Sequence, residues 1–576
     1  MSKAILVYFR ERIDYSDQIY RKLKTICENL QPDNFQANAP QLWKNGTTFY
    51  GITNPVDSVK KTKSSVLLGK LYGEEGKWDI PKSQKPDGSY VIIRSDNESI
   101  ELVTDIVGSR SIWYYKDNKV FIASTSQLAI VKLLGNFEFN EETISWMLSS
   151  GTLGPGSSWD KRLSVAEPDT VISLNKKSWV LNKTTNSIEF KSVITDWEIA
   201  KPELNSKLYN VFEKLDFDYN HWIVPLSGGV DCRAMVNLLK KTEKGSDRLR
   251  TVTWGRPKSR YEKRNDAYIA KKAAAELNVE NIFYPSINTE EDIDTKMKRY
   301  VLCGEGRIDH IQAYMDGFEL WKTLFNKKDY GIIRGDEGFG WKPVQDEFSV
   351  RASIDLFKLS DFEVFQKFNE FDFHDQKIPD YLLKKTDESY ATWRDRLYHQ
   401  YRIPTILSAL ADLKYPYVEQ ASPLLSREII KFVRLLNDDM RTDKKLFKQW
   451  IESLGFNIPF ATRSANESRN YLINSPEFVK YMRSQLSSET ANKIFARDFL
   501  SYIRNNLIVN SFKDELFHDV KSRLIGYLPQ SLKRTRNKNI EQTLSYNLIA
   551  LRVVIVIQVY NIFNHTHPNN SEYSRL

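Results

Sequence analysis

Cysteine is scarce in this chain. Only Cys27, Cys232 and Cys303 occur among 576 residues, and they lie far apart. Small secreted domains are held together by several disulfides, and cysteine-type zinc sites need closely spaced pairs of ligands. The sequence therefore predicts neither arrangement and fits a reducing compartment.

The chain also lacks a block of one charge sign. Its 83 Lys and Arg residues and 74 Asp and Glu residues are spread along its length and leave a net charge of +9. Such a mild excess is compatible with an anionic ligand, whereas nucleic-acid-binding domains carry a more strongly basic face. We therefore do not expect a nucleic acid as partner.

Long hydrophobic runs are missing as well. The N-terminal stretch MSKAILVYFRERID turns to charged residues after a short apolar run and has no small-residue cleavage site of a secretory signal. The most apolar segment, residues 547–563, is interrupted by Arg552 and is shorter than the roughly 20 apolar residues of a membrane-spanning helix. We expect a buried C-terminal helix, no membrane insertion and a cytoplasmic location.

The chain does have enough apolar residues for large cores, because 41% of its residues are hydrophobic and 12% are aromatic. Its length predicts two or more domains. Up to about residue 195, β-rich runs such as SYVIIRS and SIELVTDIV alternate with turns, which predicts stacked antiparallel sheets. From about residue 200, helical stretches separate the apolar strands HWIVPL, RTVTW and YGIIRG, which predicts a parallel sheet. Residues 191–203 are the expected boundary.

A glycine-rich loop follows the first of these strands. Residues 225–235 read PLSGGVDCRAM, and the helix expected after the loop would direct backbone N–H groups toward an anion. The loop matches neither the Walker pattern nor the dinucleotide-binding pattern. Two interpretations remain at this point, namely a phosphate-binding loop and a tight turn that uses glycine for its geometry alone.

A second acidic turn lies about 100 residues further on, in YGIIRGDEGFGWKP. There Asp336 and Glu337 follow another apolar strand. Parallel strands deliver their loops to one edge of a sheet, so Asp231 and Asp336 are expected to face the same ligand. Two carboxylates beside a polyphosphate are typical of a Mg²⁺ site.

Lysines recur in RTDKKLFKQWIESL, where Lys444 and Lys448 are spaced to share one face of a helix. The alternative is a solvated helix face without function. The preceding segment, YVEQASPLLSREII, contributes Glu419. The glycine-rich loop, the acidic turn, this segment and the lysine segment follow one another in an order that favours a functional role for the lysines.

Together these segments resemble the asparagine synthetase family. LSGGVDC resembles the pyrophosphate loop S-G-G-x-D-S of enzymes that split ATP into AMP and pyrophosphate, and RGDEGFGW resembles the turn G-x-x-D-E-x-F-G-G. The lysine segment resembles the family's K-x-x-L-R helix, with Lys448 where arginine is usual, and VEQASPLL resembles E-x-R-x-P-F-L-D without its arginine. In the N-terminal half, PDGSYVII, TDIVGSRSIWYY and VFIASTSQLAIVKLL resemble segments of the glutaminase domain.

The resemblance covers most of the chain and implies its fold class. Over residues 1–198 it implies an α+β, Ntn-hydrolase-like sandwich of antiparallel sheets. Over residues 199–576 it implies an α/β pyrophosphate-loop ATPase domain of the adenine nucleotide α hydrolase-like type, with a helical C-terminal part.

Departures from the family pattern are concentrated in the glutaminase half. Ser2 stands where the family has its nucleophilic cysteine, and residues 68–73 read LGKLYG where the family has N-G-E-I-Y-N with its oxyanion-binding asparagine. The R-G-P-D segment that holds glutamine is absent. We expect no glutaminase activity, and in this the chain resembles β-lactam synthetases and lasso-peptide cyclases.

The resemblance implies an ATP-dependent ligase of a specialised biosynthetic pathway that adenylates a carboxylate, with release of pyrophosphate, and then joins the acyl group to an amine. The amine belongs either to a second molecule or to the same substrate, as in the formation of a β-lactam or a peptide macrolactam. ATP and Mg²⁺ are the implied cofactors. The implied partners are a small-molecule or peptide carboxylate and an amine, with a peptide-delivery or pathway protein as a further option. Two alternatives stay open: an ammonia-dependent asparagine-type synthetase, and a catalytically silent protein that binds nucleotide or a partner.

The resemblance to the asparagine synthetase family also implies which residues form the site. Asp231 and Asp336 would hold Mg²⁺, and Lys444 would offset negative charge during the reaction. A base is harder to choose, because Ile333 occupies the position where relatives carry a tyrosine or glutamate. The candidates are Tyr401, Glu419 and Glu337. The nucleotide would be bound by Leu226, Ser227, Gly228, Gly229, Asp231, Cys232 and Gly335, and Cys232 is interpreted as a packing residue.

Overall fold

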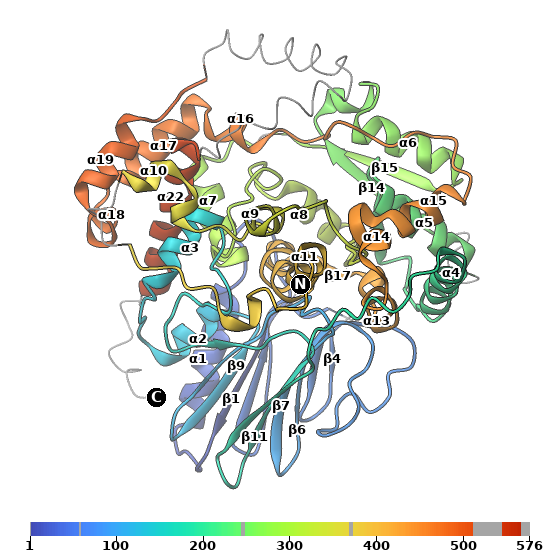
Figure 1. Ribbon diagram of the computed structural model, residues 1–576. Coiled ribbons are helices and arrows are strands. Elements are labelled where there is room, and N and C mark those ends of the chain that lie inside the picture. Colours follow the sequence, from blue (N-terminus) through green and yellow to red (C-terminus); the bar gives the residue numbers. More distant parts are fainter. Residues whose placement is uncertain are drawn as a thin grey trace.

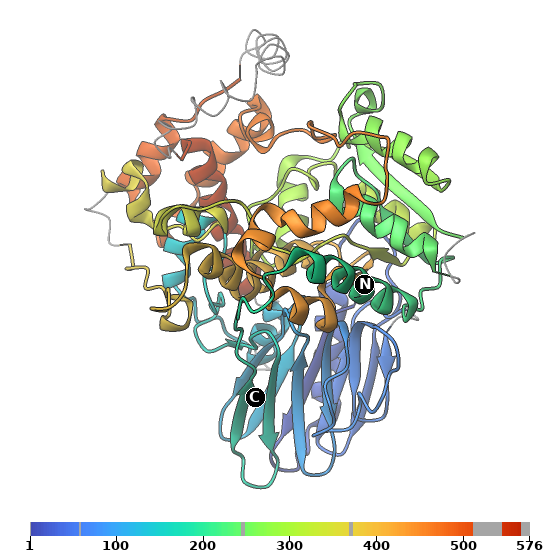
Figure 2. The ribbon, with the colours of Figure 1, turned by 45° about the vertical axis from the view of Figure 1, so that its right-hand side comes forward.

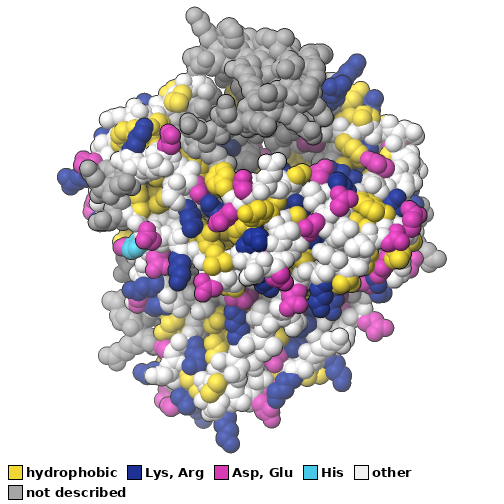
Figure 3. Space-filling view, in the orientation of Figure 1, with side chains coloured by type: hydrophobic (Ala, Val, Ile, Leu, Met, Phe, Trp, Pro, Cys, Tyr) yellow, Lys and Arg dark blue, Asp and Glu magenta, His cyan; other side chains and the backbone are white. Residues whose placement is uncertain are grey.

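The computed structural model describes residues 2–56, 59–242, 248–287, 289–367, 373–510 and 544–565. Figures 1 and 2 show two regions, an N-terminal part built from β-sheets and a larger, helix-rich part that lies against one end of it. Figure 3 shows basic and acidic side chains interspersed over the face in view, as their spread along the sequence suggests.

The N-terminal part contains two six-stranded sheets in which all neighbouring strands are antiparallel. The first has the order β10 (Ser164–Val165), β8 (Trp113–Lys116), β9 (Val120–Ser124), β1 (Ala4–Phe9), β3 (Thr48–Ile52) and β2 (Gln41–Asn45). The second has the order β12 (Leu181–Thr185), β11 (Thr170–Asn175), β7 (Ser99–Thr104), β6 (Gly88–Ser95), β5 (Val66–Leu71) and β4 (Lys60–Lys61). The predicted antiparallel sheets are confirmed.

Strand β1 shows why the two sheets stack. Successive side chains of a strand point to opposite faces. Leu6 and its alternate neighbours belong to the apolar core that they share with Val91 and Leu102 of the second sheet. Val7 belongs to another core, together with Leu23 of helix α1 (Ser16–Asn29). Because both faces are covered, every residue of β1 is buried.

The C-terminal part is organised around a five-stranded parallel sheet. Its order is β15 (Glu280–Pro285), β14 (Arg250–Gly255), β13 (Trp222–Pro225), β16 (Gly331–Ile333) and β17 (Glu419–Ala421). Helices α5 (Val230–Lys241) and α6 (Asp266–Glu276) follow β13 and β14 along the chain. The predicted alternation of strands and helices in a parallel sheet is confirmed.

The remaining helices of the described residues belong to both parts of the chain. They are α2 (Gln127–Leu134), α3 (Glu142–Ser150), α4 (Trp197–Glu213), α7 (Ile293–Gly304), α8 (Glu319–Asn326), α9 (Glu347–Ser353), α10 (Glu363–Gln366), α11 (Tyr390–Leu397), α12 (Ser408–Asp412), α13 (Arg427–Val433), α14 (Asp438–Arg441), α15 (Lys445–Glu452), α16 (Arg469–Ile473), α17 (Pro476–Leu486), α18 (Glu489–Ile494), α19 (Arg497–Asn505) and α22 (Tyr546–Asn564). A π-helix, η4 (Tyr398–Leu407), joins α11 to α12, and short 3₁₀ turns are η1 (Pro257–Arg260), η2 (Leu359–Asp361), η3 (Asp380–Leu382), η5 (Pro423–Leu425) and η6 (Thr442–Lys444).

Helix α22 is the predicted C-terminal apolar helix. By length and composition it could cross a membrane, but 78% of its most apolar window is buried inside the protein. It packs against α17, α3 and α7. Its arginine, Arg552, is buried as well, where its Nε atom donates a 2.7 Å hydrogen bond to Asp309. The prediction of a buried helix is confirmed.

The expected boundary segment lies against the C-terminal part. Ile194 donates a backbone hydrogen bond to Leu435 and accepts one from Asn437. Asp196 then caps helix α4 by accepting the N–H of Glu198. Hydrogen bonds therefore hold the segment against the C-terminal part and fix where α4 begins.

Candidate active site

A cavity of about 270 Å³ lies at the carboxyl ends of the parallel strands. The loops after β13 and β16 both contribute to it, as expected for parallel strands that end at one edge. It is lined by Pro225, Leu226, Ser227, Asp231, Cys232, Thr253, Trp254, Asp266, Arg334, Gly335, Asp336, Ala465 and Asn466. Asp231 and Asp336 thus share one cavity, as the sequence suggests.

The glycine-rich loop is held by hydrogen bonds to its own residues and to α6. The Ser227 hydroxyl accepts the N–H of Gly229 at 3.2 Å and lies 3.5 Å from the sulfur of Cys232. The N–H of Gly228 donates to Asp266 at 3.3 Å. Burial raises the pKa of the Cys232 thiol, which is consistent with a packing residue.

Gly228 has a packing reason to be glycine. A Cβ atom there would lie 2.3 Å from the Cβ atom of Ala461, whose N–H donates to the Gly228 carbonyl. Gly228 and Gly229 are not among the residues that line the cavity. Close packing of the chain segment at Ala461 is therefore sufficient to require the first glycine.

Lys444 meets two carboxylates beside this loop. Its Nζ atom lies 2.6 Å from Oε1 of Glu337 and 3.0 Å from Oδ2 of Asp231. Burial disfavours the charged ammonium, but the two carboxylates outweigh this effect and raise the pKa of Lys444. Burial also raises the pKa of Glu337 to about 7, although Lys444 opposes the shift. The cluster joins three segments that are remote in the sequence.

The geometry of Lys444 corrects one prediction. Lys444 and Lys448 do not share a helix face, because α15 begins only at Lys445. Asp443 and Lys444 both have left-handed backbone conformations, with φ of 57° and 55°. The N–H of Asp443 donates to the Trp341 carbonyl at 2.8 Å, so a tertiary contact holds this bend. Lys448 is instead partly exposed and pairs with Asp443 at 2.8 Å.

Asp336 is surrounded by partners that sequence reasoning missed. Arg334 donates to its Oδ1 atom at 3.1 Å, and Gln420 and Ser422 each donate to its Oδ2 atom at 3.1 Å. Burial alone would raise the pKa of Asp336, but Arg334 outweighs it, so the pKa lies below its ordinary value. Only the pairing of β16 with β17, which the sequence does not specify, brings Gln420 and Ser422 to this carboxylate.

Two of the three candidate bases lie in other surroundings. The Tyr401 hydroxyl shares a 3.2 Å hydrogen bond with Thr152 of the N-terminal part. Glu419 forms a buried ion pair with Arg110, also of the N-terminal part. Glu337 is the candidate that the structure brings to Lys444.

Asp231 and Asp336 fit a Mg²⁺ site only if water and the phosphate oxygens of a bound substrate complete the coordination shell. The described residues contain no group of three or more His, Cys, Asp or Glu side chains that could hold a metal ion. Mg²⁺ commonly binds through one or two carboxylates and completes its shell with water and phosphate oxygens. The two aspartates at the cavity are compatible with this mode.

Ser2 is buried close to the contact between the N-terminal and C-terminal parts. Its hydroxyl donates to the carbonyl of Asn54 at 3.2 Å, and its own carbonyl accepts a hydrogen bond from Arg110 at 3.3 Å. Only 1% of its surface is exposed. Arg110 thus contacts both the backbone of Ser2 and the side chain of Glu419 in the parallel sheet.

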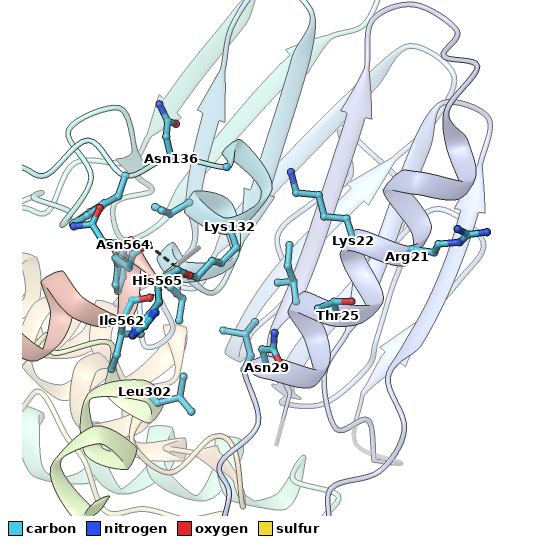
Figure 4. Close-up of a pocket in the computed structure, with 17 residues that line it drawn as sticks. Arg21, Lys22, Thr25, Asn29, Lys132, Asn136, Leu302, Ile562, Asn564 and His565 are labelled. Carbon is cyan, nitrogen blue, oxygen red and sulfur yellow. Dashed lines mark hydrogen bonds between the residues drawn. The ribbon is translucent and has the colours of Figure 1, made fainter. Parts of the chain in front are cut away.

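A larger cavity, of about 830 Å³, lies between α1, α2 and the end of α22 (Figure 4). Lys22 and Lys132 extend into this region in the close-up. Lys22 donates to the carbonyl of Leu133, and Lys132 to the carbonyl of Ile562 at the end of α22. These lysines therefore stabilise helix C-termini.

Comparison with known proteins adds no relative: neither a protein-family model nor a curated protein matches this chain.

Proposed function

We propose that the chain is an AMP-forming ligase that joins a carboxylate to an amine. The observation that supports this best is the meeting of Lys444, Asp231 and Glu337 beside the cavity at the sheet edge. A cation next to carboxylates and a glycine-rich loop is an arrangement suited to phosphate transfer. The resemblance of the same segments to asparagine synthetases indicates the type of reaction, which is adenylation of a carboxylate followed by transfer of the acyl group to an amine.

The proposal extends to the architecture. In it, residues 1–198 form an Ntn-hydrolase-like domain without glutaminase chemistry, and residues 199–576 form a pyrophosphate-loop synthetase domain. The antiparallel sandwich and the parallel sheet support this division. The protein would act in the cytoplasm.

In the first step, a substrate carboxylate oxygen attacks the α-phosphorus of ATP. The bond from that phosphorus to the bridging oxygen breaks, and pyrophosphate leaves with the electron pair. Asp231 and Asp336 would hold Mg²⁺, which, when bound, offsets phosphate charge. Ser227 and the helix N-terminus of α5 would position the phosphates.

In the second step, the amine nitrogen attacks the acyl carbon, the bond to AMP breaks, and the nitrogen loses a proton. Lys444 would stabilise negative charge that develops in both steps. We assign proton acceptance to Glu337, because it is the candidate base that lies beside Lys444. An amide results.

Carboxylate-dependent ATP–pyrophosphate exchange tests the proposal. We expect a panel of amino acids and peptides to contain acids that drive exchange, and turnover with an amine to release AMP. ADP as the main product would overturn the proposal, since a pyrophosphate loop cleaves between the α- and β-phosphates. Aspartate turnover with ammonia alone would select the ammonia-dependent synthetase. Nucleotide binding without exchange for any acid would indicate the silent alternative.

A further inference from the structure

Arg334 is the first residue after β16 and stands at the edge of the cavity. Its backbone N–H donates to the carbonyl of Ala421 at 2.7 Å and so continues the pairing of β16 with β17. This backbone bond fixes where the side chain starts. The side chain lines the cavity together with Ser227 and Asp231 of the glycine-rich loop.

Charge at the cavity makes Arg334 distinctive. Among the described residues that line it, Asp231, Asp266 and Asp336 are acidic and Arg334 is the one with a positive charge. Three carboxylates would repel a polyphosphate unless cations compensate them. A guanidinium can hold two phosphate oxygens at once in a fixed planar geometry.

The contacts of Arg334 with the described part of the protein do not use all the N–H donors of its guanidinium group. Its Nη2 atom donates to Asp336 at 3.1 Å, whereas its Nε atom is buried and has no hydrogen-bond partner in the described part of the chain. The side chain is 32% exposed, against 13% for Asp336. An arginine guanidinium stays charged in proteins, so Arg334 brings a positive charge to the cavity.

We propose that Arg334 binds phosphate oxygens of ATP, and of the departing pyrophosphate, on the Asp336 side of the cavity. This inference rests on the proposed function. Arg334 forms no covalent bond in the reaction. It holds the negative charge that moves onto pyrophosphate as the bond to the α-phosphorus breaks.

Direct binding of inorganic pyrophosphate and of ATP, measured by calorimetry, tests this role without turnover. We expect Arg334→Ala to weaken both by about tenfold or more and Arg334→Lys to bind with intermediate affinity. Trp254 lines the same cavity, so its fluorescence can follow binding independently. Circular dichroism and thermal melting of each variant establish that it is folded.

Arg250→Ala is the matched control. Arg250 is 26% exposed and pairs with the buried Asp329 at 2.6 Å, but it starts β14 and so lies at the opposite edge of the same sheet. We expect its pyrophosphate affinity to equal that of the wild type. Equal affinities of Arg334→Ala and Arg250→Ala would overturn the inference.

Chemical rescue separates phosphate binding from a structural role. Millimolar guanidinium should restore part of the exchange activity of Arg334→Ala and leave that of Arg250→Ala unchanged. A folded Arg334→Ala variant could keep normal pyrophosphate affinity but lose exchange that guanidinium does not restore. That result would contradict the inference about Arg334 and leave the proposed function standing. A wild type that binds pyrophosphate through Arg334 yet shows no acid-dependent exchange would support the inference and reject the proposed function.

Discussion

The ammonium nitrogen of Lys444 lies 3.0 Å from the Oδ2 atom of Asp231, a residue 213 positions earlier in the chain. The contact ties the segment before α15 to the glycine-rich loop. Because Lys444 also contacts Glu337, it neutralises charge that two buried or half-buried carboxylates would otherwise place side by side. Negative charge that develops on the reacting groups would compete with these carboxylates for the same ammonium group.

Replacing Lys444 should therefore affect the reaction more than nucleotide binding. We expect Lys444→Ala to keep the ATP dissociation constant within a few-fold of the wild-type value while turnover falls by on the order of 10², because the charge it offsets develops mainly in the transition states. Steady-state kinetics and calorimetry measure the two quantities. Lys445→Ala is the control, since Lys445 pairs with Asp439 at the surface. Equal turnover of the two variants would remove Lys444 from the site.

Asp231 should be required for the first step itself. Asp231→Asn keeps the size of the side chain but removes the charge that Mg²⁺ and Lys444 need, so acid-dependent pyrophosphate exchange should disappear. The matched control is Asp439→Asn, which breaks the exposed pair with Lys445 and should exchange normally. Exchange at the wild-type rate in Asp231→Asn would show that this carboxylate is not part of the site.

Some of this site follows from local sequence. The pattern of an apolar strand, glycines and a helix predicts the β13–α5 loop, because each element is determined by neighbouring residues. Carboxyl ends of parallel strands then bring Asp231 and Asp336 to one cavity. Both inferences need only the order of the elements along the chain.

The rest of the site depends on tertiary contacts. The spacing of Lys444 and Lys448 predicts a shared helix face, but the contact of Asp443 with Trp341 holds a left-handed bend that ends the pattern. In the same way, Gln420 reaches Asp336 only through the register of β16 and β17. Such pairings join remote segments, and no local periodicity encodes them.

The buried position of Ser2 bears on glutamine hydrolysis. A nucleophilic side chain must reach its substrate, whereas the Ser2 hydroxyl is buried and donates to Asn54. We expect no glutamate release from glutamine above a no-enzyme control, and no effect of Ser2→Ala on ligation. Glutamate release that Ser2→Ala abolishes would show that the N-terminal part has glutaminase activity.

Arg110 and Glu419 form a buried ion pair across the junction of the two regions, with 2% and 1% of their side chains exposed. Arg110→Met would leave the Glu419 carboxylate buried without its charged partner, which costs on the order of 3–5 kcal/mol. We expect a lower thermal midpoint for Arg110→Met, with much of the loss recovered in Arg110→Met/Glu419→Gln. A double variant no more stable than the single one would show that packing of Arg110 on Tyr415, rather than charge pairing, dominates.

His399 should make the fold sensitive to acid. Burial, assisted by Arg434, lowers the pKa of His399 to about 3, and its ring lies 2.9 Å from the Gly338 carbonyl and accepts a hydrogen bond from Arg434. An unfolded histidine titrates near pH 6.5, so the unfolded state binds the extra proton first. The contribution of neutral His399 to the free energy of unfolding is therefore complete above about pH 6.5. It is lost as the pH falls toward 3, at up to about 1.4 kcal/mol per pH unit.

Unfolding midpoints at pH 7, 6 and 5 should fall less steeply in His399→Gln than in the wild type, whereas the exposed control His374→Gln should follow the wild type. Parallel profiles for the wild type and His399→Gln would refute the assignment.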